Sequence, residues 1–559
     1  MPTTTEHQPH HRESTAHRSA PGLTSGSRHA AAALAVLLLA VVAYLNCLAG
    51  EFVLDDQAFY VNNPSLTANH DVSRFFTSSV WEHSILARQS DPLYRPVFML
   101  AMWVNQSLFG SSTIAHHAFS ILLHALASLM LLQLLRRLLP NAGTLPPLAG
   151  ALLFAAHPVH VEAVSWISAF GHPLATLLLL GALLCHLRHG ESGKPWPLAL
   201  SLGLFGLALL SMEVAIAFPL IVTCYEYLDH RRLLTLRNVA PWVLLLCYVV
   251  LRTAVLAQAV PLDLTSAAPW KTAANFAGAY LDQLLVPWPQ PFYLSTPEHG
   301  ISLSAHGVAT IIIGATLAFA LVRRNLPDRR VLLFGICWIL FSLTAPVLAA
   351  LNPHPMFAVR SLYLASAGVS ILIAWFLTHC RQVKLPAALF VGLLVTTALA
   401  TTVLATRSWR TELAIVEKVL ATAPGNDAAA VKAADFYDAG GKFELAEKTL
   451  LAALPHAPTT SARAILHNRL GMLYGTHNLF DKSAGQYRET LQFDPANSPA
   501  LVGLGNIALL RNDYRTAISR YLAAIEADPN NREAYFNASL AYRRLGDNVL
   551  ADDYLRKAR

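Results

Sequence analysis

Long apolar runs alternate with short polar segments between residues 30 and 405. Most of these runs are long enough to cross a bilayer, because a spanning helix needs about 20 apolar residues, and only the fifth and sixth are short. The pattern predicts spans near 30–49, 114–135, 147–166, 171–187, 196–211, 213–228, 238–257, 305–322, 331–350, 361–379 and 385–405. A further apolar segment, 268–288, fits either the membrane or its interface, so we expect about eleven spans.

Residues 409–559 follow another pattern, with more charge and a regular period. Pro495 and Pro529 have the spacing of tetratricopeptide repeats. In the clearest repeat Gly505 and Tyr521 take the small and aromatic positions that let paired helices pack closely. Earlier repeats place Gly471, Tyr474 and Tyr487, and then Ala434, Tyr437, Ala446 and Ala453, at related positions. This region is predicted to be a small α-solenoid.

Composition supports a membrane protein, with 54% hydrophobic and 13% charged residues and a mean hydropathy of +0.42. The predicted class is all-α. A multispan helical membrane domain covers residues 30–408, with an outer loop at 50–113, and the repeats follow at 409–559. Residues 1–29 are rich in His, Ser, Thr and Pro without an apolar period, which predicts a disordered cytoplasmic tail.

The net charge of +7 comes largely from basic residues in the short loops between spans, which favours membrane topology over nucleic-acid binding as its explanation. Every second loop carries at least two basic residues, as the positive-inside rule requires of cytoplasmic loops. These loops are Arg136/Arg137, Arg188 to Lys194, Asp229 to Arg237, Arg323 to Arg330 and Arg381 to Lys384. The N-terminus is therefore predicted inside, and loop 50–113 and the repeats outside. Alanine- and leucine-rich composition and short loops favour a bacterial inner membrane with periplasmic repeats.

Two adjacent carboxylates, Asp55 and Asp56, follow the first span. Such a pair suits general-base chemistry, since one group can stay ionised while the other orients a substrate. The competing interpretation is that they cap a loop or helix. The same outer loop holds Tyr94 and Arg95 just before 97–109, an apolar segment that we expect to lie in the interface.

Other polar residues are predicted at the same membrane face. His157, His160 and Glu162 end the third span, and two histidines three apart share a face if the helix continues. Ionisable residues near a bilayer mark sites by default, and we favour contacts to substrate or phosphate. A divalent metal stays an alternative cofactor, as does plain packing, and no metal ligand set is assigned.

Three further loops add His172, Glu213, Arg360 and Tyr363 to this face. An arginine beside carboxylates can hold a phosphate through two hydrogen bonds. The alternative for Arg360 is a snorkelling side chain at the interface.

In order, the segments Asp55-Asp56, Tyr94-Arg95-Pro96 and His157-Pro-Val-His160-Val-Glu162 resemble the transmembrane and tetratricopeptide-repeat O-mannosyltransferases of the GT-C superfamily. The resemblance implies transfer of a sugar, usually mannose, from a polyprenyl-phosphate lipid to a protein hydroxyl, with inversion. It implies that Asp55 or Asp56 is the general base. The partners are then the lipid-linked sugar, the membrane and an acceptor protein bound by the repeats, with no nucleic acid.

The chain differs from the family pattern in three segments, where His172, Met212 and Val359 replace charged residues and one further carboxylate and one aromatic residue are also missing. These differences motivate a rival function, a membrane-anchored repeat scaffold without catalysis. A lipid-sugar flippase ranks third, because transporters place ionisable residues nearer the bilayer midplane.

Overall fold

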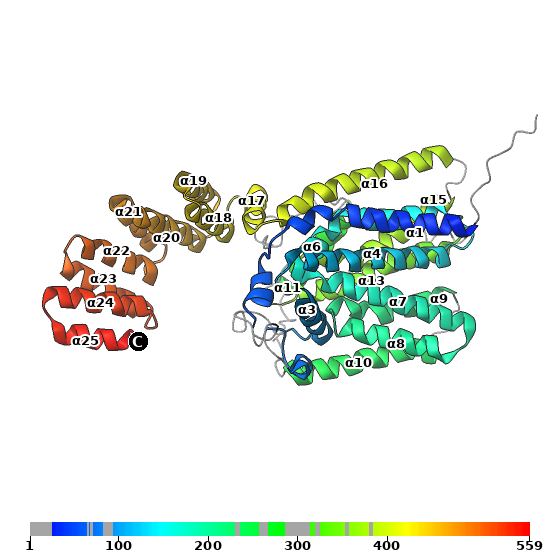
Figure 1. The fold of residues 1–559 in the computed structure, drawn as a ribbon, viewed down its shortest axis with the longest axis horizontal. Helices are drawn as coiled ribbons and strands as arrows, with labels where there is room; N and C mark the ends of the chain where they lie inside the picture. Colours follow the sequence, from blue (N-terminus) through cyan, green and yellow to red (C-terminus); the bar gives the residue numbers. More distant parts are fainter. Residues whose placement is uncertain are drawn as a thin grey trace, which may run out of the picture.

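A computed structural model describes residues 25–559, except for 64–65, 67–70, 82–92, 230–234, 257–266, 286–313, 318, 320–322, 324, 353–356 and 380–383. The described residues form helices and connecting segments, with no strand among them. Figure 1 shows long helices side by side in a bundle and, beyond one end of it, a curved row of paired helices. The predicted all-α class is confirmed. Most of the predicted tail, residues 1–24, lies outside the described part.

The first half of the bundle begins directly after the tail and includes a short helix in the outer loop. Its helices are α1 (Ser25–Val42), α3 (Pro96–Phe109), α4 (Thr113–Leu138), α5 (Leu145–Ala156), α6 (Val161–Ser165), α7 (Gly171–Ser192) and α8 (Pro195–Leu209). The second half has α9 (Phe218–Asp229), α10 (Leu236–Leu256), α11 (Ala267–Leu285), α13 (Arg329–Ser342), α14 (Thr344–Ala349), α15 (Ser366–His379) and α16 (Lys384–Thr406).

By length and apolar composition, six described helices could each cross a membrane, or seven if a bent pair counts as one span. The bent pair is α5 with the segment Pro158–Ser165, at an angle of 43°. Predicted spans 196–211, 213–228 and 361–379 contain shorter helices of 15, 12 and 14 residues. The span at 305–322 lies mostly outside the described residues. The count of about eleven therefore stays a prediction.

One cluster of buried apolar side chains in the bundle extends into the first helices of the repeats. Leu131, Phe154 and Leu179 belong to it, and so do Trp409 and Val416 at the start of the C-terminal region. The two parts of the chain are thus packed together through apolar contacts, as well as being joined in sequence.

The C-terminal region is a row of antiparallel helix pairs, as the period predicts. Its helices are α17 (Glu412–Thr422), α18 (Asp427–Ala439), α19 (Phe443–Ala453), α20 (Thr460–Thr476), α21 (Phe480–Phe493), α22 (Ser498–Leu510), α23 (Tyr514–Ala527), α24 (Arg532–Leu545) and α25 (Asn548–Lys557). Gly505 is required where it stands, because a Cβ there would lie 2.5 Å from the Tyr521 ring. Gly471 faces Tyr487 at 2.6 Å in the same way.

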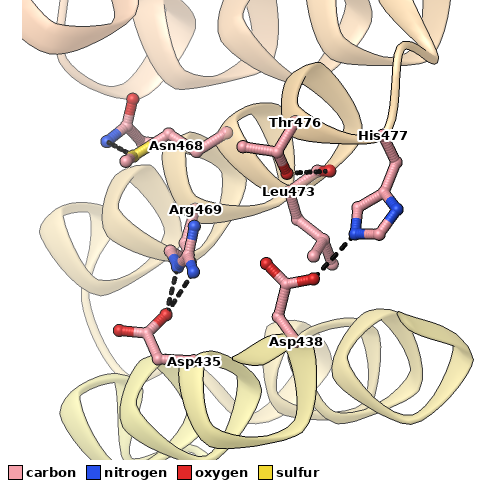
Figure 2. Close-up of polar contacts among 8 residues, drawn as sticks. Asp435, Asp438, Asn468, Arg469, Leu473, Thr476 and His477 are labelled. Atoms are coloured by element: carbon pink, nitrogen blue, oxygen red, sulfur yellow. Dashed lines mark hydrogen bonds and ion pairs between the residues drawn. The ribbon is translucent and has the colours of Figure 1, made fainter. Parts of the chain in front are cut away.

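Polar contacts join successive repeats at their helix ends and faces. Figure 2 shows an ion pair between Asp435 of α18 and Arg469 of α20. In the same view Asp438 accepts a hydrogen bond from His477 at 2.7 Å. These contacts add registry to a stack whose main support is apolar packing.

Candidate functional site

Asp55 and Asp56 follow a residue with a strained backbone. Leu54 has a φ of 51°, a left-handed conformation that costs a bulky side chain about 1–3 kcal/mol and is often found at functional sites. Asp56 is fully buried, and its Oδ1 accepts hydrogen bonds from the N–H (2.8 Å) and the hydroxyl of Ser168. Its Oδ2 accepts from the N–H of Val53 at 3.0 Å. Asp56 therefore fastens the outer loop to the segment between α6 and α7.

Asp55 is half-buried, and no side-chain hydrogen bond joins it to another residue in the described part of the chain. Burial raises the pKa of its carboxyl, against the opposing charges of Arg360 and Lys432. Burial also raises the pKa of Asp56, to about 7, and the hydrogen bonds from Ser168 only partly oppose this. Of the two carboxylates, Asp55 has the uncommitted oxygens that a proton acceptor needs.

Glu162 and Arg360 form a nearly buried ion pair between α6 and the 3₁₀ helix Val359–Leu362. The backbone N–H of Arg360 donates to the second carboxylate oxygen of Glu162 at 3.2 Å. The guanidinium carbon lies 5.0 Å from the ring centroid of Trp166. A carboxylate thus lies beside Arg360, although position 359 is a valine.

Arg95 and Glu213 form a second pair, which joins the outer loop to the segment after α8. The Nε of Arg95 lies 3.1 and 2.9 Å from the two carboxylate oxygens, and a terminal nitrogen lies at 2.7 Å. His172 is buried and interacts electrostatically with both Arg95 and Arg360, so the two pairs flank it. A guanidinium has five N–H donors, so one arginine can contact more than one anion.

Tyr363 and the histidines form a buried polar cluster behind these pairs. The Tyr363 hydroxyl lies 2.6 Å from Nδ1 of His124, and Nε2 of His160 lies 2.7 Å from the Ser366 hydroxyl. The rings of His160 and Tyr363 are 4.3 Å apart. His157 accepts a hydrogen bond at 3.4 Å from the N–H two residues further on. The cluster packs and orients this end of the bundle.

The third predicted span, 147–166, is not one continuous helix in the structure. α5 ends at Ala156, and a 3₁₀ helix covers Pro158–His160, since proline lacks the N–H that a continuing helix needs. His157 and His160 therefore do not share the face of one helix. No three His, Cys, Asp or Glu side chains among the described residues gather into a group that could hold a metal ion.

Tyr94 is placed differently from the other candidates. Its side chain is buried, and its hydroxyl donates to the carbonyl of Phe76 in the outer loop at 3.0 Å. Sequence reasoning missed Ser168, Trp166 and Lys432, whose partners lie far away along the chain. No local pattern marks them, because their contacts depend on how distant segments meet.

Comparisons with known proteins agree with these motifs. A tetratricopeptide-repeat family model matches residues 413–470. A protein O-mannosyl-transferase of Caenorhabditis elegans is 33% identical over 199 residues, which are 35% of this chain and 28% of that protein. TMTC1 of Homo sapiens, also a protein O-mannosyl-transferase, is 34% identical over 210 residues, covering 35% and 24%. The chain thus matches about a quarter of the length of these curated relatives.

Among solved structures, MamA aligns at 22% identity with a TM-score of 0.23, covering 26% of this chain and 79% of that one. YrrB, a repeat protein with an unusual peptide-binding site, aligns at 19% identity with a TM-score of 0.22, covering 29% and 81%. These scores are too low to carry an argument. The named relatives and the family model instead confirm that this chain resembles the transmembrane and tetratricopeptide-repeat O-mannosyltransferases.

Proposed function

We propose that this chain is a membrane glycosyltransferase of the GT-C type. It moves a sugar from a polyprenyl-phosphate lipid to a protein hydroxyl and inverts the anomeric centre. The names of the relatives support mannose as the sugar and protein as the acceptor. The observation that carries the proposal is the arrangement around Asp55, a carboxylate without a hydrogen bond to described side chains, near the Glu162–Arg360 pair.

In the proposed reaction Asp55 takes the proton of the acceptor hydroxyl while the oxygen of that hydroxyl attacks the anomeric carbon of the sugar. The bond from that carbon to the lipid-phosphate oxygen breaks, and its electron pair leaves with the phosphate. Arg360 stabilises the departing charge, with Arg95 and His172 nearby. A positioned general base contributes about 10²–10⁴-fold, and holding donor and acceptor together supplies much of the rest.

Several features support this assignment of roles. Burial raises the pKa of Asp55, which brings a carboxylate closer to the range in which a general base works best. Asp56 is engaged in three hydrogen bonds and so positions the segment that carries Asp55. Glu162 and Glu213 hold the two arginines in fixed orientations.

The predicted topology completes the proposal. The backbone N–H of Glu51 donates to the carbonyl of Arg410 at 2.9 Å, so the outer loop and the repeats meet at one end of the bundle. The repeats then lie on the same side of the membrane as Asp55 and bind the acceptor protein. The relatives come from eukaryotes, and the bacterial inner membrane stays a prediction from composition.

The proposal is tested by transfer of labelled mannose from polyprenyl-phosphate-mannose to protein in membranes that contain the intact chain. Product from the intact chain and none from Asp55→Asn at equal protein level is the expected result. Equal product from both would refute the role of Asp55.

A non-catalytic scaffold is the second candidate function, and a groove in the repeats favours it. This groove has a volume of about 420 Å³ and is lined by Met472, Val502, Asn506 and Leu510, among others. Leu510 is 63% exposed and Met472 44% exposed, so apolar surface is available for a partner. The scaffold reading predicts that deleting 409–559 abolishes the cellular phenotype and that Asp55→Asn leaves it intact.

A further inference from the structure

Two tryptophans from distant parts of the chain stack beside the candidate site. Trp166 follows α6, and Trp409 ends the 3₁₀ helix Arg407–Trp409 that leads into the repeats. Their ring centroids are 5.8 Å apart with an interplanar angle of 24°. Both side chains are buried, at 3% and 4% exposure. The guanidinium of Arg360 also lies over the ring of Trp166, with its carbon 5.0 Å from the ring centroid.

The backbone around Trp409 is fixed to the segment that leads to Asp55. Arg410 accepts a hydrogen bond from the N–H of Glu51 at 2.9 Å, and its own Nε donates to the carbonyl of Asn46 at 3.2 Å. The side-chain amide of Asn46 donates to the hydroxyl of Thr406 at 2.6 Å. Two hydrogen bonds thus tie Arg410, at the start of the repeats, to the segment that leads to Asp55, and a third ties that segment to the end of α16.

A cation of the repeats also acts on the candidate base. Lys432 of α18 forms an ion pair with Glu412 of α17. The positive charges of Arg360 and Lys432 lower the pKa of the Asp55 carboxyl, against the rise that burial causes. The first repeat helices therefore contribute to the electrostatic surroundings of the site as well as to its packing.

We propose that the start of the repeat region completes the lipid-phosphate site, with Trp409 as a positioning residue that holds Arg360 in place through Trp166. This inference rests on the proposed function, in which Arg360 binds the phosphate of the donor. The guanidinium is held at its edge by Glu162 and on its face by Trp166. Without Trp409 the indole of Trp166 loses its stacking partner, and the face of the guanidinium loses its support.

The size of the effect follows from the contacts that are lost. The lost contacts are the aromatic pair itself and the support that it gives to a cation over a ring, each of modest strength. Loss of the stack should therefore weaken phosphate binding by about 3- to 10-fold, since about 1.4 kcal/mol corresponds to tenfold. Because Arg360 also stabilises the departing phosphate, the rate at saturating donor should fall as well, although Asp55 and the acceptor are not displaced directly.

The test compares Trp409→Leu, Trp409→Phe and the more exposed control Trp196→Leu with the intact chain in lipid nanodiscs. Trp196 begins α8 and also lies under an arginine, with the guanidinium carbon of Arg188 at 5.2 Å from its ring. Binding of sugar-free polyprenyl phosphate is titrated, and KM and kcat are measured with the sugar-linked donor. We expect weaker binding and a raised KM for Trp409→Leu, near-normal values for Trp409→Phe, and no change for Trp196→Leu.

The outcomes separate this inference from the function on which it rests. If the intact chain binds and transfers, and Trp409→Leu binds polyprenyl phosphate equally well, the inference fails and the proposed function stands. If Trp409→Leu lowers kcat and thermal stability alone with unchanged binding, Trp409 is structural and the inference also fails. An intact chain that neither binds polyprenyl phosphate nor transfers sugar overturns both.

Discussion

The two adjacent aspartates should respond in opposite ways to the same isosteric substitution. Asp55→Asn removes a proton acceptor whose oxygens have no hydrogen bond to a described side chain, so stability should change by no more than about 0.5 kcal/mol. Transfer should fall by about 10²–10⁴-fold, the usual contribution of a general base. That range corresponds to about 3–5 kcal/mol in the activation barrier.

Asp56→Asn changes a fully buried side chain that accepts three hydrogen bonds. An amide keeps only one acceptor oxygen, so its NH₂ group must face the donor of either Ser168 or Val53. An unsatisfied buried donor costs about 1–3 kcal/mol. The expected result is a lower thermal midpoint, with activity reduced to the extent that the loop carrying Asp55 shifts.

The assay measures two quantities on the same detergent-purified proteins. Transfer of labelled mannose is normalised to the amount of folded protein. The thermal midpoint is the temperature at which half of the protein is no longer recovered as monodisperse protein after heating. Inactive but stable Asp55→Asn together with destabilised Asp56→Asn supports the assignment. The reasoning is refuted if Asp56→Asn is inactive at full stability while Asp55→Asn remains active, because the base would then be the buried carboxylate.

Three other predictions concern pH, ion pairing and the repeats. Because the pKa of folded Asp56 is raised to about 7, the stability that its proton contributes is complete below its unfolded pKa of about 4 and is lost as pH rises through about 7. Thermal midpoints of the intact chain should show this decline and those of Asp56→Asn should not, whereas parallel curves would contradict it. Arg95→Met alone should destabilise more than the same change combined with Glu213→Leu, because a half-buried carboxylate that has lost its cation costs more than an apolar pair. A double-mutant cycle in thermal midpoints with simply additive effects would contradict this. Gly505→Ala should destabilise the repeats by about 1–3 kcal/mol, because the added methyl group would clash with the Tyr521 ring. The measurement is hydrogen exchange, which should become faster in α22 and α23. The control Gly485→Ala, which has open space around the added methyl group, should leave exchange unchanged.

Much of the architecture could be predicted because it depends on local patterns. Apolar runs such as 114–135 and 238–257 correspond to α4 and α10 within a few residues. The repeat period placed Gly505 and Tyr521 at the small and aromatic positions, and the structure shows that the two are packed together, because a repeat packs mainly against itself and its neighbours. The break before His160 was missed, although Pro158 is visible in the sequence, because proline is often tolerated in membrane helices.

The candidate site was predicted as a set of residues on one membrane face, without its pairings. Asp56 and Ser168 are 112 residues apart, and Glu162 and Arg360 are 198 residues apart. The sequence contains both members of each pair, and nothing in their local surroundings indicates the partner. It could not distinguish Asp55 from Asp56, since the two are adjacent in the chain and differ only in burial and in hydrogen bonds to distant segments.

The sequence by itself therefore determined the helices, the repeats and the supply of charged groups, because periodicity and hydropathy act over a few turns of chain. Only the tertiary structure decided which carboxylate is committed to a hydrogen-bond network and which is left uncommitted. It also decided that Trp409, from the repeats, stacks on Trp166 beside Arg360. These outcomes depend on long-range packing, in which distant segments compete for the same buried space.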